Sequence, residues 1–120
     1  MDFGELFRHE RKRAGKNLGE VAQRLNVSLT YLSDVERSTR PPLSIDRIRD
    51  AALFMAIPGD RVLALLKAAA AYQGAFELPV PSSSMGKEAG AALARGWNSL
   101  DDDAFRQIVD VVTGGKGKVR

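Results

Sequence analysis

The chain has 120 residues, with 18 Lys and Arg against 15 Asp and Glu for a net charge of +3, and this length suits one domain with an appendage. It contains no cysteine and a single histidine, His9, which excludes disulfide frameworks, thiolate zinc sites, cysteine nucleophiles and histidine metal clusters. We therefore expect a protein that is not an enzyme and that needs no cofactor and no metal.

The sequence contains no stretch with the pattern of a membrane span or a secretory signal. The longest mostly apolar stretch, residues 62–72, is interrupted by Lys67 and is far below the roughly 20 residues that span a bilayer. The first seven residues carry two acids ahead of a basic cluster, the reverse of a secretory signal. We expect a cytoplasmic protein that does not bind membranes.

Charge is unevenly distributed along the chain. Residues 8–49 hold ten basic and five acidic side chains, whereas residues 75–112 hold three basic and six acidic ones. The basic half is therefore the part suited to a polyanionic partner.

Local signals predict three short helices in the N-terminal part. Apolar residues at helical spacing predict a first helix that Asp2 caps and Gly15 ends. Asn17 and Glu20 have the spacing of a capping box, which starts a second helix that runs to Leu25. The sequence therefore predicts a second helix of only about two turns.

A tight turn follows the second helix. Asn26 is suited to a left-handed backbone conformation, and Ser28 is placed to cap a third helix that ends near Arg37. A fourth helix is predicted to open at Ser44 and to end before Pro58. A fifth, over about residues 60–73, is apolar nearly all round, so we expect it to be central.

Composition changes after the fifth helix. Residues 74–84 are rich in Gly, Pro and Ser and are predicted to be a linker between a domain of residues 1–73 and a C-terminal segment. Residues 85–112 are predicted to form a helical hairpin, with Ser84 capping the first helix and residues 101–103 opening the second. Residues 113–120 are basic and glycine-rich, and we expect a flexible tail.

The hairpin has an apolar stripe on each of its helices. It is too small to bury both stripes alone, so we expect it to meet a partner surface. The candidate residues for a dimer or partner seam are Trp97, Leu100, Phe105, Ile108 and Val112.

A short helix, a tight turn and a capped helix form the geometry of a helix-turn-helix. Residues 11–37 resemble, without a gap, the phage-repressor-like (Cro/C1, XRE) helix-turn-helix family. The matching positions include Glu20 and Ala22 in the second helix, Val27 and Ser28 in the turn, and residues 31–33 and 35–37 in the third helix. The resemblance covers about residues 3–73 and implies an all-α, five-helix DNA-binding domain followed here by the C-terminal hairpin.

The resemblance also implies roles for individual residues. An ion pair between Arg11 and Glu36 would fix the third helix against the first. The start and outward face of the third helix would read bases through Leu29, Thr30, Ser33 and Asp34. Residues placed to contact phosphates are Lys16, Arg24, Ser28, Tyr31, Arg37 and Arg40.

Two positions depart from the family pattern. Relatives often carry a basic or Gln-type reader where this chain has Asp34, and a Gln that binds the DNA backbone where it has Leu18. Asp34 is suited to accept a hydrogen bond from cytosine, but it also brings a negative charge near phosphates. These departures leave open a module that has lost DNA recognition and binds protein instead.

Together these features predict a sequence-specific transcriptional regulator, a repressor that binds double-stranded DNA as a homodimer. Its operator would be nearly palindromic, with half-sites about 10 bp apart or a multiple of that. A DNA-binding antitoxin, whose hairpin covers a toxin, is the other alternative. In that case a protein partner would occupy the hairpin.

Overall fold

The structure is a computed structural model that describes residues 1–114. This part of the chain is built from seven α-helices and one short 3-10 helix and contains no strand, which confirms the all-α prediction. None of its helices is long and apolar enough to cross a membrane. The chain divides into two compact units, Met1–Glu77 and a second that begins at Leu78. The predicted basic tail lies, from residue 115 onward, outside the described residues.

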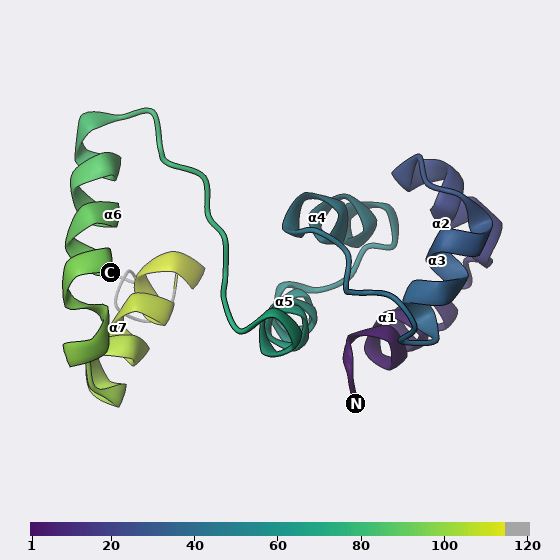
Figure 1. The fold of residues 1–120 in the computed structure, drawn as a ribbon, viewed down its shortest axis with the longest axis horizontal. Coiled ribbons are helices and arrows are strands. Elements are labelled where there is room, and N and C mark those ends of the chain that lie inside the picture. The colour runs from purple at the N-terminus through teal and green to yellow at the C-terminus, as the bar shows by residue number, and fades with distance from the viewer. Residues whose placement is uncertain (115–120) are drawn as a thin grey trace. The chain divides into compact units, whose positions relative to one another are not determined.

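The first unit consists of five helices (Figure 1). Their bounds are Phe3–Arg13 for α1, Leu18–Leu25 for α2, Leu29–Glu36 for α3, Ile45–Phe54 for α4 and Gly59–Gln73 for α5. In sequence and in space α2 and α3 are neighbours, and each also packs against one further helix, α2 against α4 and α3 against α1. Helix α5 packs against α1 and α4.

The caps predicted for the first four helices are present. The Asp2 side chain accepts a hydrogen bond from the Glu5 amide at the start of α1, and the Asn17 side chain accepts one from the Glu20 amide at the start of α2. In both cases the glutamate side chain accepts from the backbone of the cap residue, which completes a capping box. Ser44 caps α4 in the same way as Ser28 caps α3. These local signals mark where α1, α2, α3 and α4 begin, whereas α5 has no side-chain cap.

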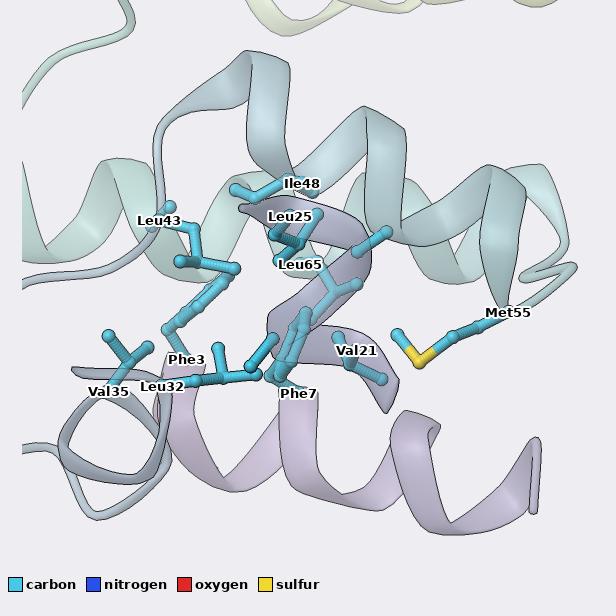
Figure 2. Close-up of a cluster of buried hydrophobic side chains, with 13 residues drawn as sticks. Phe3, Phe7, Val21, Leu25, Leu32, Val35, Leu43, Ile48, Met55 and Leu65 are labelled. Carbon is cyan, nitrogen blue, oxygen red and sulfur yellow. The ribbon is translucent and has the colours of Figure 1, made fainter. Parts of the chain in front are cut away.

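A single hydrophobic cluster holds the five helices together (Figure 2). Every helix contributes to it, and the largest fully buried side chains are Phe7, Leu32, Leu43, Ile48, Leu65, Val21 and Val35. The rings of Phe3 and Phe7 stack with their centroids 5.8 Å apart. Burial of these side chains supplies the main favourable free energy of folding for the unit.

Helix α1 approaches the end of α3 closely at Gly4. A Cβ atom at this position would lie 2.5 Å from the carbonyl oxygen of Val35 and 2.7 Å from that of Glu36. Just beyond α3, the Ser38 hydroxyl donates a 2.7 Å hydrogen bond to the Asp2 carboxylate. The N-terminus of α1 is thus fixed against the C-terminus of α3, and glycine is required for the approach.

The prediction that the fifth helix is central is wrong. Only Leu65 and Ala69 of α5 are buried, and Leu63 is 44% exposed. The helix packs on α1 and α4, and one stripe alone meets the core. Because the helix is apolar nearly all round, the sequence did not reveal which stripe that is.

The second unit contains α6 (Ser84–Gly96), a 3-10 helix η1 (Trp97–Ser99) and α7 (Asp102–Thr113). Ser83, not Ser84, caps α6, and Asp101 caps α7. No residue of these helices is buried. The indole of Trp97 lies 5.1 Å from the ring of Phe105, yet Trp97 remains 50% exposed.

Candidate nucleic-acid interface

Helices α2 and α3 are joined by a tight turn with a defined backbone. Asn26 has φ 57°, the left-handed conformation predicted from its sequence position. The amide of Val27 donates to the carbonyl of Ala22 at 3.0 Å, which closes the end of α2. The Ser28 hydroxyl then accepts from the Tyr31 amide at 3.0 Å and begins α3. The turn and its caps therefore set the angle between the two helices.

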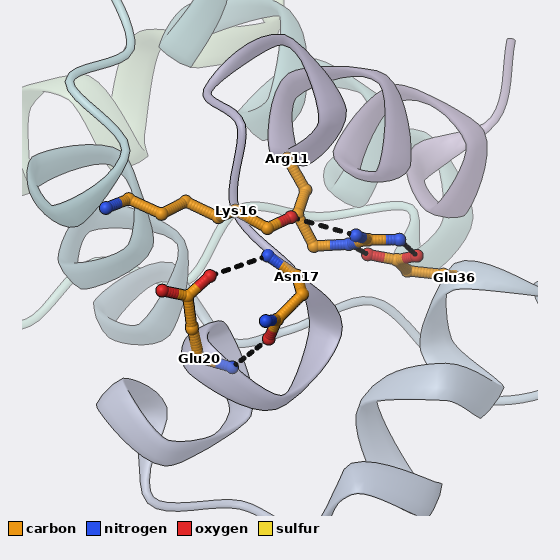
Figure 3. A network of polar contacts seen from close by, with 5 residues as sticks. All are labelled: Arg11, Lys16, Asn17, Glu20 and Glu36. Atoms are coloured by element: carbon orange, nitrogen blue, oxygen red, sulfur yellow. Dashed lines mark hydrogen bonds and ion pairs between the residues drawn. The ribbon is translucent and has the colours of Figure 1, made fainter.

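Arg11 on α1 and Glu36 at the end of α3 form a bidentate ion pair (Figure 3). The guanidinium Nε and Nη2 donate to the two carboxylate oxygens at 2.7 and 2.9 Å, and Nη1 donates to the carbonyl of Lys16 at 3.0 Å. The hydrogen bonds to Glu36 raise the pKa of Arg11 above its ordinary value, against the opposing effect of burial. The pair connects α1, the loop before α2 and α3.

A second buried acid, Glu10, pairs with Arg61 on α5 at 2.9 Å. Glu10 is 6% exposed, and the two residues lie 51 positions apart in the sequence. The sequence gives no signal for this pair, because no local spacing links its members. Adjacent residues of α1 thus bind two different helices, with Arg11 bound to α3 and Glu10 bound to α5.

The exposed face of α3 carries the four predicted base-reading residues. Leu29 is 55% exposed and Thr30 is exposed, while Ser33 and Asp34 are half-buried. The half-burial has a cause, because Arg37 covers both residues. Its Nη1 donates to the Ser33 hydroxyl at 2.8 Å, and its Nη2 forms an ion pair with Asp34.

Arg40 joins the same group from the loop after α3. Its Nε lies 3.7 Å from the other carboxylate oxygen of Asp34, and its guanidinium lies 5.1 Å from the centre of the Tyr31 ring. Arg47, at the start of α4, lies 6.0 Å from that ring. Arg47 was not singled out in the sequence, where it fits a solvated helix surface. The structure thus places Arg40 and Arg47 beside Tyr31 of α3.

The other predicted phosphate contacts gather elsewhere, around Phe54 of α4. The Lys16 ammonium lies 4.7 Å and the Arg24 guanidinium 5.4 Å from the centre of its ring. Arg24 also pairs with Asp50 at 2.9 Å. The four cationic phosphate candidates therefore form two groups, Lys16 with Arg24 near Phe54 and Arg37 with Arg40 around Asp34.

The remaining predicted residues have simpler surroundings. Leu18, the position that departs from the family pattern, packs half-buried against the core. In the second unit Leu100, Phe105 and Ile108 are half-buried, whereas Val112 is 77% exposed. These seam candidates all belong to the second unit.

Comparison with known proteins identifies the first unit. A family model described as helix-turn-helix domain matches residues 2–70. The chain belongs to the helix-turn-helix domain family. The match does not specify the Cro/C1 branch, and no curated protein and no solved structure shows significant similarity to the chain. The matched residues include α2, the turn and α3.

Proposed function

We propose that this protein is a sequence-specific DNA-binding transcriptional regulator, a repressor whose helix α3 enters the major groove. The observation that carries the proposal is the outward face of α3, where Thr30 is exposed and Ser33 accepts from Arg37. The helix is held by its N-cap and by the Arg11–Glu36 pair. A helix positioned on a packed scaffold with polar side chains outward is what reading of base edges requires.

In this proposal base reading and backbone contact belong to different side chains. Thr30 and Leu29 at the start of α3 meet thymine methyl groups or base edges, and Ser33 and Asp34 meet the next bases. The backbone is contacted on both sides of the groove by the two groups of cations, Lys16 with Arg24 and Arg37 with Arg40, and by Tyr31 and the amides that follow Ser28. The positive potential of these groups attracts the duplex before any base is read.

We further propose that two copies bind together. The second unit has an apolar side that includes Trp97, Phe105 and Ile108, and no residue of α6 or α7 is buried in a single chain. Pairing of two such units would bury that side and would double the DNA contacts of a small domain. A two-fold dimer then requires a nearly palindromic operator with half-sites about 10 bp apart or a multiple of that.

Selection of bound fragments from the source genome at physiological salt tests the reading role. The wild-type protein is compared with Thr30→Ala/Ser33→Ala, and with Ser82→Ala/Ser99→Ala as a control that removes two exposed hydroxyls from outside the helix-turn-helix domain. We expect a near-palindrome enriched by the wild type and the control and lost in the α3 variant. Equal enrichment of the same sequence by all three proteins would contradict the proposal that Thr30 and Ser33 of α3 read bases.

Sedimentation at micromolar concentration tests the dimer. We expect a dimer for the wild type and a shift towards monomer for Trp97→Ala/Phe105→Ala. A strict monomer without DNA contradicts the homodimer. Co-purification of a neighbouring gene's product would instead support the antitoxin alternative, with the hairpin covering a partner protein.

A further inference from the structure

Helix α3 carries an acid, Asp34, that pairs with one cation at the end of the helix and lies close to another in the loop that follows. Asp34 binds Arg37 through one carboxylate oxygen and lies 3.7 Å from the Nε of Arg40 through the other. The side chain of Asp34 is 23% exposed, whereas those of Arg37 and Arg40 are 63% and 51% exposed. The carboxylate therefore lies beneath two solvent-facing guanidinium groups.

Folding does not explain this arrangement. Ion pairs whose cations face solvent contribute little to stability, and the backbone here is already held by other bonds. The carbonyl of Asp34 accepts from the amide and the hydroxyl of Thr39 at 2.9 and 3.1 Å, which orders the chain after α3 without the carboxylate. The consequence of the pairing lies instead in what it does to the two arginines.

Both arginines belong to the predicted phosphate contacts, and the pairing lowers their joint charge from +2 to +1 with Asp34 included. Arg37 is further held by Ser33, a predicted base reader, and Arg40 by the Tyr31 ring. An arginine that moves to a phosphate must leave the carboxylate behind, next to a polyanion. That exchange is unfavourable unless the carboxylate receives another donor.

We propose that Asp34 is a specificity-determining residue that keeps Arg37 and Arg40 from the phosphates of DNA without a matching site. This inference rests on the proposed function. At a matching site the amino group of a cytosine donates to Asp34 in the major groove, and the arginines are released to the backbone. On other sequences the carboxylate keeps its arginines, and binding loses those contacts. Asp34 thus raises discrimination mainly by weakening non-specific binding.

The test measures affinity for a duplex of unrelated sequence and for the selected operator between 50 and 200 mM salt. Asp34→Asn keeps the side-chain shape and an oxygen acceptor but removes the charge. For unrelated DNA we expect the log–log salt slope to steepen by about 0.9 for each arginine released, so that the loss of affinity across this range grows by roughly 3- to 12-fold. Affinity for the operator should change less. The specificity ratio, which is the affinity for the operator divided by that for unrelated DNA, should therefore fall.

Two controls separate this effect from added charge and from misfolding. Asp60→Asn removes the same charge from the exposed first turn of α5 and should leave the specificity ratio unchanged. In an Arg37→Ala/Arg40→Ala background, Asp34→Asn should no longer alter the slope, because the groups on which it acts are gone. Circular dichroism verifies that each variant is folded.

A second variant tests the cytosine contact. Genomic selection with Asp34→Ala should lose a cytosine preference at one position in each half-site while the remaining positions persist. An unchanged cytosine preference in Asp34→Ala overturns the role of Asp34. An unchanged salt slope in Asp34→Asn does the same, provided that the wild type binds DNA in a salt-dependent way. Neither outcome overturns the proposed function. Absence of salt-dependent binding by the folded wild type overturns the proposed function, and this inference with it.

Discussion

The two units of the chain are built from helices of similar length and reach different degrees of burial. In the first, five helices place side chains such as Phe7, Leu32 and Ile48 completely out of solvent. In the second, no residue of α6, η1 or α7 is buried, although α7 carries an apolar side. The sequence of an amphipathic helix therefore shows which side is apolar. That side becomes buried only where several other helices pack against it.

The first unit also has polar bonds between its helices that the second lacks among its described residues. The Arg11–Glu36 and Glu10–Arg61 pairs join helices distant in sequence. In the second unit the ion pair between Arg106 and Asp103 joins residues on one helix, both largely exposed. The interhelical bonds therefore belong to the first unit. The second unit keeps an apolar side exposed, which the proposed dimer would cover.

Truncation of one aromatic side chain in each unit should show the largest difference in stability between the two units. Phe7 is fully buried, so Phe7→Ala should lower the free energy of unfolding by about 3–5 kcal/mol. The matched Trp97→Ala removes a larger ring that is half exposed, and it should leave unfolding of the first unit within about 0.5 kcal/mol of wild type. Urea unfolding followed by circular dichroism measures both. Equal losses would mean that the units share one core.

The buried ion pair gives the next largest effect. Glu36→Ala leaves the Arg11 guanidinium, whose side chain is 12% exposed, without its carboxylate, and we expect a loss of about 3–5 kcal/mol. Asp103→Ala removes the acid of the exposed pair in α7 and should change stability by less than about 1 kcal/mol. Chemical denaturation is the measurement. A Glu36→Ala variant as stable as the wild type would contradict the structural role of the pair.

A Gly→Ala substitution should lower stability in the first unit and raise it in the second. Gly4→Ala places a methyl group against the carbonyl oxygens of Val35 and Glu36 and should cost about 1–3 kcal/mol as α1 is pushed from α3. Gly90, inside α6, has open space where a Cβ would lie, so Gly90→Ala should favour the helix by about 0.5–1 kcal/mol. Thermal melts of the two variants measure the difference. Destabilisation by both would indicate that α6 packs where the structure leaves it open.

How much the sequence could predict depends on the range of each signal. The caps at Asp2, Asn17 and Ser28 act within three residues of the chain, so the helix starts of the first unit were predictable. The pairing of Glu10 with Arg61 and the buried stripe of α5 depend on residues far apart in sequence, and neither had a local signal.

The candidate interface divides in the same way. The family resemblance indicated Ser33 and Asp34 on the third helix and Arg37 at its end, and their spacing allows contact. The resemblance did not predict that the Arg37 guanidinium pairs with Asp34 instead of extending into solvent. That pairing depends on the side-chain conformations around it, including the hydrogen bond to Ser33 and the position of Arg40.

The smallest expected effect concerns pH and the cap of α1. Hydrogen bonds from the Glu5 amide, and then from the Ser38 hydroxyl, hold the pKa of Asp2 below its ordinary value. The folded chain therefore keeps the carboxylate ionised at a pH where the unfolded chain already binds a proton. This contribution to stability is present above the unfolded pKa and is lost as pH falls through the folded one.

Asp2→Asn keeps an oxygen acceptor for the Glu5 amide, places an amide NH2 where the second oxygen accepts from Ser38, and removes the charge. The variant should be slightly less stable than wild type near neutral pH, and the gap should close as the solution is acidified below the usual range of a carboxyl group. Thermal melts at a series of pH values measure the gap. Asp46→Asn, in the first turn of α4, is the control for loss of one exposed acid. A gap that widens on acidification would mean that the charge of Asp2 opposes the contact between α1 and the end of α3.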